Sequence, residues 1–288
     1  MRRDRPSTTA SAVAFARAVA ALPGSRAPSS DPFAKALLHP ALGVLLRALE
    51  PLAERTRAVD LALRVASVGL VDHLALRTAA IDAALEARLA AGLRQLVVLG
   101  AGLDARAYRL RGIEDAVVLE VDHPATQRFK RERARSLRPR ARELRWVAVD
   151  FERERLADRL AAEGHDASAP TLWLWEGVLP YLAPAATAAT LEQIRARSAP
   201  GSALVLTYGP SHDQPWLALA PPVHLAFRAL GEPLRGLMTR EELHGLLAAA
   251  GFRVESDTGT RDWRARYAWG IRPLLLIEER LVVARADA

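Results

Sequence analysis

Short apolar runs alternate with longer amphipathic stretches from about residue 95 to the end of the chain. The first five runs are rich in β-branched and apolar residues on both faces, a pattern typical of buried parallel strands. The alternation of such strands with helical stretches predicts an open α/β sheet. The predicted strands cover residues 95–102, 116–122, 144–150, 171–178, 202–208, 252–259 and 274–285.

Two of the intervening stretches carry clear helix-end signals. The segment 184–201 ends in Pro-Gly, which stops a helix. In the segment 239–251, Thr239 is the predicted N-cap and Glu242 completes a capping box with it. Gly251 is the expected stop of that helix.

Two regions fall outside this alternation. Residues 1–90 are rich in alanine and leucine and predict helices, so we expect an N-terminal helical part ahead of a core that spans 91–288. Residues 209–238 form a long insertion between two predicted strands. Connections of this length inside a compact domain are usually lids or binding loops.

Composition narrows the class of protein. The absence of cysteine excludes disulfides, thiolate metal sites and cysteine nucleophiles, and no metal site is predicted. Charges interrupt every long apolar stretch, so we expect no transmembrane helix and no membrane partner. Arg17 interrupts the apolar run near the N-terminus, which favours an amphipathic helix over a signal peptide. The default location is then the cytoplasm.

The net charge of +7 is concentrated in one segment. Residues 128–145 hold nine basic residues against Glu132 and Glu143, an excess equal to that of the whole chain. One interpretation is a patch for nucleic acid or an acidic partner. The other is a solvated helix and loop, which the scarcity of aromatic residues beyond Phe129 and Trp146 favours over nucleic acid.

Acidic residues follow the predicted strands, and a glycine turn follows the first of them. Gly100, Gly102 and Ala105 nominally satisfy a dinucleotide fingerprint, and Asp122 lies twenty residues beyond Gly102, where a ribose-binding acid is expected. Asp104, however, places a carboxylate in the turn, which would repel a pyrophosphate by roughly 1–4 kcal/mol at contact distance. The turn therefore favours S-adenosylmethionine, a cationic cofactor without phosphate. Alternatively, Asp104 caps the following helix, and the two roles are compatible.

Several motifs together resemble one known family. The segments VVLGAGLDARAYRL, LEVDHP, VAVDFE and PTLWLWEGVLPYL are similar to the bacterial branch of the leucine carboxyl methyltransferase-like family. The resemblance extends through most of the chain. It implies a Rossmann-like seven-stranded sheet with the last strand antiparallel. It also implies that residues 1–90 form a helical cap over an S-adenosylmethionine site and that 209–238 form a substrate-side insertion.

The resemblance also implies roles for individual residues. Arg77 matches the arginine that pairs with the methionine carboxylate, and Asp122 matches the ribose-binding acid. Glu176 matches the acid near the cofactor's ammonium group, and Lys35 is a loose match to a lysine of the cap. The other expected cofactor-binding positions are Gly100, Ala101, Gly102, Asp104, His123, Asp150, Phe151 and Gly177.

Each of these assignments has a structural alternative. Arg77 could form an ordinary ion pair on a helix surface. Tyr181 is as compatible with a core position as with a substrate wall. For Glu120 and Arg106 we favour a structural role, in which the two pair with each other across neighbouring elements.

The expected reaction is O-methylation, and the acceptor class stays open at this point. A carboxylate of a small molecule or peptide is ionised at neutral pH and needs no general base. A hydroxyl or phenol acceptor of a natural-product pathway would benefit from one, and the weak candidates are His212, His224 and Tyr181. The apolar insertion suggests a hydrophobic acceptor. The alternatives of other classes are a nicotinamide-dependent oxidoreductase, for which no Tyr-x-x-x-Lys pattern is present, and a binding module for nucleic acid or an acidic partner.

Overall fold

A computed structural model describes residues 8–150, 153–211, 234–269 and 278–287. The chain forms helices and strands in the alternating order that the apolar runs predict. In chain order they are α1 (Thr8–Ala20), α2 (Ala34–Leu37), α3 (Pro40–Arg55), α4 (Ala58–Ala66), α5 (Leu70–Ala90), β1 (Gln95–Leu99), α6 (Arg106–Arg109), β2 (Val117–Asp122), α7 (Pro124–Arg133), β3 (Glu143–Ala148), α8 (Leu156–Ala162), β4 (Thr171–Trp175), the 3-10 helix η1 (Leu179–Tyr181), α9 (Pro184–Ala196), β5 (Ala203–Tyr208), α11 (Arg240–Ala249), β6 (Phe252–Gly259), α12 (Thr260–Tyr267) and β7 (Arg280–Ala286).

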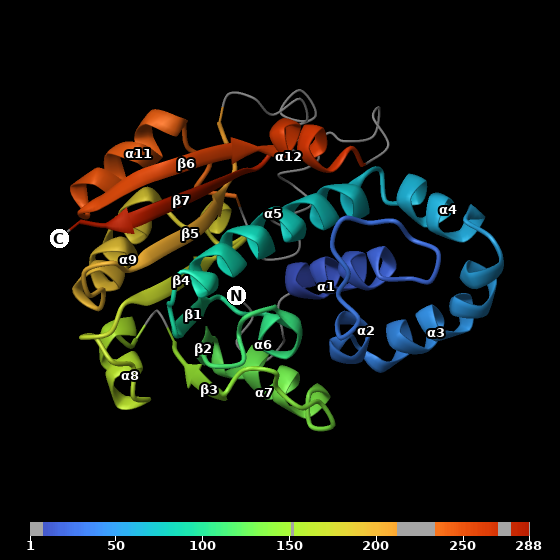
Figure 1. The fold of residues 1–288 in the computed structure, drawn as a ribbon, viewed down its shortest axis with the longest axis horizontal. Coiled ribbons are helices and arrows are strands. Elements are labelled where there is room, and N and C mark those ends of the chain that lie inside the picture. The colour runs from blue at the N-terminus through green and yellow to red at the C-terminus, as the bar shows by residue number, and fades with distance from the viewer. Residues whose placement is uncertain (1–7, 151–152, 212–233, 270–277, 288) are drawn as a thin grey trace.

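The strands form one seven-stranded sheet in the order β3-β2-β1-β4-β5-β7-β6 (Figure 1). Strands β1 to β5 pair with one another in parallel, whereas β7 is antiparallel to both of its neighbours, β5 and β6. This confirms the expected α/β fold with an antiparallel last strand. The strand order reverses between β1 and β4, and ligands of open α/β sheets bind beyond the carboxyl ends of the strands at such a point.

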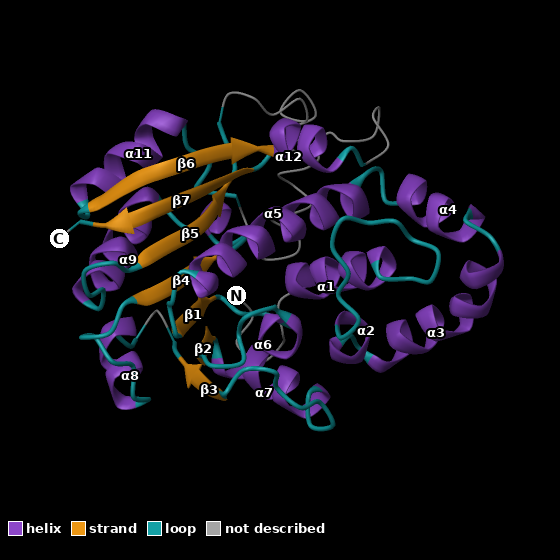
Figure 2. Cartoon of the chain, viewed as in Figure 1, coloured by secondary structure: helices purple, strands orange, loops and turns teal. Residues whose placement is uncertain are grey.

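Alternating side chains of the central strands enter two separate hydrophobic cores. Leu96 and Val98 of β1 pack with α1, α5 and α12 on one face. Val97 and Leu99 pack with α8, α9 and α11 on the other. Helices therefore cover both faces of the sheet, as Figure 2 shows, which explains why these strands are apolar at every position.

The N-terminal helices gather on one side of the sheet. In Figure 1, α1 to α4 lie beyond α5, which runs between them and the strands. The core cluster that contains Val19 of α1 also contains Leu85 of α5 and Leu96 of β1. The expected helical N-terminal part is therefore present, and its division from the core at residue 90 stays a prediction.

Several element ends differ from the predicted ranges. We predicted strands through Gly102 and Val178, but β1 ends at Leu99 and β4 ends at Trp175. The reason is backbone conformation, because Gly100 and Gly177 adopt φ values of +65° and +67°, which an extended strand does not accommodate. The capping box of Thr239 and Glu242 is confirmed at the start of α11.

The long insertion is described only at its two ends. Pro210 forms a β-bridge with Met238, so the insertion leaves and re-enters the fold at one place. Arg235 and Gly236 donate backbone hydrogen bonds to the carbonyl of Pro180 in η1 at 2.8 and 3.0 Å. Over the residues that the structure describes, none of the helices is both long and apolar enough to cross a membrane.

The turn after β1 generates a stability prediction. A Cβ on Gly100 would lie 2.5 Å from Cγ2 of Val178, and the residue already has a left-handed φ. We expect Gly100→Ala to lower the free energy of unfolding by about 2 kcal/mol, measured by urea denaturation. Gly245→Ala is the control, since it lies in α11 with no atom within 4 Å of its Cβ and should gain about 0.5–1 kcal/mol. An unchanged stability of Gly100→Ala would contradict the close approach.

Candidate cofactor site at the strand ends

The glycine turn after β1 and the carboxylate that ends β2 form one hydrogen-bonded unit. Asp122 accepts hydrogen bonds from the backbone N–H groups of Gly102 at 2.5 Å and His123 at 2.6 Å. Burial raises the pKa of Asp122, although these two hydrogen bonds act to lower it. The neighbouring Ala101 is buried and donates its N–H to the carbonyl of Val121 in β2. The turn is thereby held against the end of β2.

Asp104, the acid within the turn, is buried and paired. Its Oδ1 accepts the backbone N–H of Arg106 at 2.6 Å, and its Oδ2 contacts the Arg106 guanidinium. Burial alone would raise the pKa of Asp104, but the charge of Arg106 lowers it overall. The N-cap of α6 is Ala105, which makes no side-chain cap hydrogen bond, so Asp104 is not the N-cap and binds the first residue of the helix from one position earlier. The expected repulsion of a pyrophosphate by Asp104 is wrong for this acid alone, because Arg106 neutralises its carboxylate.

Arg106 connects three carboxylates from different elements. It is fully buried, and its Nε donates to Asp82 of α5 at 2.7 Å. Its Nη1 donates both to Asp104 and to Glu176, the latter at 2.6 Å. A fully desolvated guanidinium is stable only with such compensation. Arg106 therefore joins α5, the glycine turn and the residue that follows β4.

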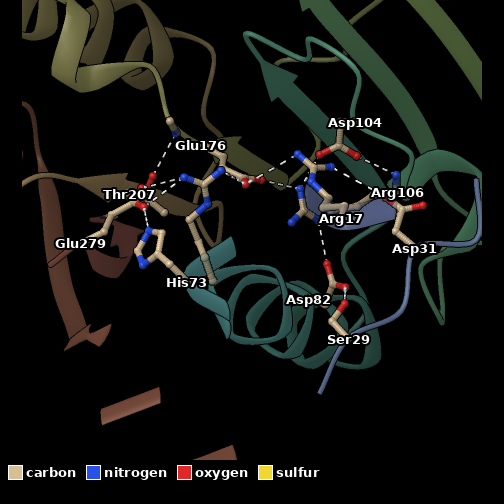
Figure 3. A network of polar contacts seen from close by, with 12 residues as sticks. Arg17, Ser29, Asp31, His73, Asp82, Asp104, Arg106, Glu176, Thr207 and Glu279 are labelled. Carbon is tan, nitrogen blue, oxygen red and sulfur yellow. Dashed lines mark hydrogen bonds and ion pairs between the residues drawn. The ribbon is translucent and has the colours of Figure 1, made fainter. Parts of the chain in front are cut away.

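Glu176 lies among three arginines directly after β4. Besides Arg106, its Oε1 lies 2.9 Å from Nη2 of Arg77 and 3.8 Å from Nη2 of Arg17. Burial would raise the pKa of Glu176, but Arg106, Arg77 and Arg17 together hold it well below its usual range. Figure 3 shows this carboxylate between the guanidinium groups. Glu176 is thus ionised and is the central acid of the site.

The network continues from Arg77 to the start of β7. Arg77 donates through Nη1 to Glu279 at 3.0 Å, and Glu279 also contacts Nε2 of His73 at 2.8 Å. Burial acts to raise the pKa of Glu279, but Arg77 and His73 lower it to about 2. Thr207 lies beside Glu279 (Figure 3), and its hydroxyl accepts the N–H of Gly177 at 2.9 Å. The network therefore reaches from the glycine turn to β5 and β7.

Arg17 brings the N-terminal helix α1 into the same network. Its side chain is only 7% exposed, yet its nearest carboxylates, in Glu176 and Asp31, lie 3.8 and 3.9 Å away. Its Nε and Nη1 atoms are buried without a hydrogen-bond partner in the described residues. Arg109 pairs with Asp82 at 2.6 Å and with Asp31 at 3.5 Å, so it connects the carboxylates that contact Arg106 and Arg17.

The charges of this network do not cancel. Among the described residues, five carboxylates face four guanidinium groups and the imidazole of His73, which adds a charge only when it is protonated. With His73 neutral, one negative charge is left in excess beside Asp122. Such an excess is complementary to a ligand with net positive charge. The carboxylates are those of Asp31, Asp82, Asp104, Glu176 and Glu279, and the guanidinium groups are those of Arg17, Arg77, Arg106 and Arg109.

The structure places the remaining predicted site residues on several different elements. Arg77 is buried to 93% and is not a surface ion pair. His123 accepts the N–H of Ala125 through Nδ1 and so caps α7. Asp150, after β3, is partly exposed and lies 3.7 Å from Arg153. Tyr181 ends η1 with a partly buried side chain.

One predicted pairing is wrong. Glu120 does not contact Arg106 but forms a buried ion pair with Lys130 at 2.5 Å. The physical reason is that α7 begins immediately after β2 and turns back over it, which places Lys130 above Glu120. Arg106 meanwhile pairs with Asp82, Asp104 and Glu176 through its Nε and Nη1 atoms. Lys35 pairs with Glu50 inside the helical cap.

Some predicted residues cannot be placed, and some site residues were missed. Phe151, His212 and His224 lie outside the described residues. Sequence reasoning did not find Arg17, Asp82 or Glu279 as site residues. A signal was available in two of them, because Arg17 and Glu279 are charges inside apolar runs. Among the described residues, no cluster of three or more His, Asp or Glu side chains could hold a metal ion.

Comparison with solved structures identifies the fold. A DUF574 family protein from Streptomyces avermitilis superposes with a TM-score of 0.63 at 16% identity, covering 98% of each chain. A protein from Thermobifida fusca has a TM-score of 0.61 at 19% identity, covering 99% of this chain and 96% of that one. Human N-acetylserotonin methyltransferase, solved in complex with SAM, gives 0.52 at 16% identity over 81% of this chain and 57% of that one. The fold is that of the S-adenosylmethionine-dependent methyltransferases.

The sequence then identifies the family. Residues 10–195 match the leucine carboxyl methyltransferase family, and the chain belongs to that family. A relative from Mycolicibacterium paratuberculosis, named "Putative S-adenosyl-L-methionine-dependent methyltransferase", is 40% identical over 70% of this chain and 66% of its own length. A relative of the same name from Mycolicibacterium vanbaalenii is 40% identical over 72% of this chain and 68% of its own. The match spans about half of a third relative, from Mycolicibacterium gilvum.

Removal of the central guanidinium tests the network. Arg106→Gln would leave Asp82, Asp104 and Glu176 without their shared cation, and we expect a loss of about 3–5 kcal/mol in the free energy of unfolding. Urea denaturation measures it. Arg111→Gln is the matched control, since its side chain is 84% exposed and 3.8 Å from Glu86, and it should change stability by less than about 0.5 kcal/mol. Similar losses in the two variants would contradict the role of Arg106.

Proposed function

We propose that the chain is an S-adenosylmethionine-dependent O-methyltransferase that methylates a carboxylate of a small molecule or peptide. The observation that carries the cofactor assignment is the buried network at the carboxyl ends of β1 and β4, with its excess of negative charge. S-adenosylmethionine brings a sulfonium, an ammonium and one carboxylate, and its net charge is positive. A site with buried acids and a few arginines is complementary to these two positive groups and one carboxylate.

The amino-acid part of the cofactor is assigned to the centre of the network. Glu176 is the proposed partner of the ammonium group, because it is ionised and its Oε1, although ion-paired with Arg77 and Arg17, accepts no hydrogen bond from the described residues. Arg77 and Arg17 are the proposed partners of the carboxylate. Each has a buried Nε without a hydrogen-bond partner in the described residues. The Nη1 of Arg17 also lacks a hydrogen-bond partner in the described residues, with its nearest carboxylate, that of Asp31, at 3.9 Å.

The nucleoside part is assigned to the ends of β2 and β3. Asp122 is partly exposed and is the proposed acceptor for the ribose hydroxyls. Asp150 lies at the end of the next strand and, with Phe151, is proposed to face the adenine. Gly100 and Gly102 allow Val178 and Ala10 to pack closely against this turn, because a Cβ on either glycine would meet those side chains. The excess of acidic groups also disfavours the pyrophosphate of a nicotinamide dinucleotide.

The chain's own contribution to methyl transfer is binding, orientation and exclusion of water. The bound cofactor supplies an activated methyl group on sulfur. The protein has to hold an acceptor oxygen in line with that group, and such positioning accounts for much of the rate. A carboxylate acceptor is already ionised at neutral pH, so it needs no proton removal. Membership of the leucine carboxyl methyltransferase family supports a carboxylate as the acceptor.

A hydroxyl or phenol acceptor is the alternative within the same chemistry. It would require a general base, for which Tyr181 is the described candidate and His212 and His224 are the others. The apolar sequence of the insertion, which includes PWLALAPPVHLAF, supports a hydrophobic acceptor of either kind. We place the protein in the cytoplasm as part of the same proposal.

The stability of the product distinguishes the two acceptor classes. We expect the enzyme, given methyl-labelled S-adenosylmethionine and the small-molecule and peptide fractions of a bacterial extract, to form a labelled methyl ester. Mild alkali should release its label as volatile methanol, whereas a methyl ether would keep the label. Asp122→Asn is the control that should transfer little label. Alkali-stable product would contradict carboxylate methylation and favour a hydroxyl acceptor.

A further inference from the structure

A groove of about 640 Å³ lies along α7, outside the buried network. Its lining includes Arg128, Arg131 and Arg135 together with one acid, Glu132. The first two arginines lie one helical turn apart on α7, and Arg135 follows one turn later, just beyond the helix end. All four of these side chains belong to exposed residues. The groove therefore presents three guanidinium groups against one carboxylate.

The surrounding segment 128–145 contains the basic residues that give the chain its net charge. Three of its nine basic side chains hold carboxylates: Lys130 binds Glu120, Arg140 binds Glu114 and Arg145 binds Glu143. By contrast, across the described ranges no carboxylate oxygen lies within 4 Å of the guanidinium groups that line the groove. These charges are available to a ligand.

Helix electrostatics explain only part of this cluster. Cations in the last turn of a helix interact favourably with its dipole, and this applies to Lys130, Arg131 and Arg133. Arg128 is in the middle of α7, and Arg135 lies beyond its end. Three like charges around one hollow repel one another, so their grouping favours a bound anion that offsets the repulsion.

The groove has the dimensions and chemistry of a small-ligand site. Its volume falls in the range of small-molecule pockets. The ring of Trp146 already has Lys130 at 5.6 Å and Arg131 at 5.9 Å from its centroid, and Phe129 packs against the core. Neither aromatic residue lines the groove, so the groove offers no ring on which a base could stack, which disfavours single-stranded nucleic acid. Guanidinium groups bind phosphate with paired hydrogen bonds.

We propose that this groove binds a compact polyanion, namely the phosphate groups of a small ligand. Gln127, Pro124 and Ala148 complete its lining, and the last two lie two residues from Asp122 and Asp150. The site therefore adjoins the strand ends β2 and β3 and shares no arginine with the network around Glu176. The proposal does not depend on the methyl acceptor or on cofactor binding.

Calorimetric titration of the full chain with sodium tripolyphosphate, at about 50 mM salt, tests the proposal. We expect saturable binding at one site. The triple variant Arg128→Gln, Arg131→Gln and Arg135→Gln should bind about thirtyfold more weakly, because it loses three charge-assisted contacts. Glu132→Gln should bind about threefold more tightly, because it removes the one acid of the groove.

The matched control removes the same charge elsewhere. Arg47, Arg138 and Arg142 are exposed and do not line the groove, so their triple replacement by Gln should weaken binding less than about threefold. Equal weakening by both triple variants would show attraction by net charge only and would overturn the proposal. Absence of saturable binding to the wild-type chain would also overturn it.

Further titrations identify the source of the phosphate. A sugar bisphosphate and a phosphoserine peptide, used in parallel, distinguish a free small ligand from a modified polypeptide, and tighter binding of either than of tripolyphosphate supports the site. Poly-glutamate or oligothymidylate that binds more tightly than every phosphate compound would overturn the proposal, because it would identify an extended acidic partner or a nucleic acid.

Discussion

The ion pairs of Glu176 with Arg106 and Arg77 are the interactions on which the rest of the site depends. They join the residue after β4 to the glycine turn after β1 and to α5, at the point where the strand order reverses. All three side chains are buried, so each charge is tolerated only because the others are present. The N-terminal helix α1 adds Arg17 to the same carboxylate. The position of α1 beside the end of β4 is therefore linked to the charge of one glutamate.

This network also gives the cofactor preference its physical basis. The acid in the turn, Asp104, is compensated by Arg106 and does not decide the ligand alone. What favours a cationic ligand is the sum over the network, in which carboxylates outnumber guanidinium groups. Among the described residues, nothing hydrogen-bonds the buried Nε atoms of Arg17 and Arg77, and these donors are the ones that we propose for the cofactor's carboxylate. A zwitterionic group with its own ammonium and carboxylate would use both features.

The sequence predicts the parts of the structure that depend on local pattern. Continuous apolar runs identify the buried strands, and the Thr239–Glu242 capping box identifies the start of α11. Asp122 and Glu176 are found because acids at the ends of parallel strands meet at one edge of the sheet. The predictions fail where a contact joins distant elements. Glu279 meets Arg77 across 202 residues, and no local spacing signals that pairing.

The most direct test compares two ligands in one variant. S-adenosylhomocysteine has the amino-acid group that the account places at Glu176, whereas 5′-methylthioadenosine has the same nucleoside without it. Calorimetry should show that Glu176→Gln binds S-adenosylhomocysteine about a hundredfold more weakly than the wild type, as expected for loss of a buried charged hydrogen bond. Its affinity for methylthioadenosine should change less than about threefold. Equal losses for both ligands, or an unchanged affinity for S-adenosylhomocysteine, would contradict the account.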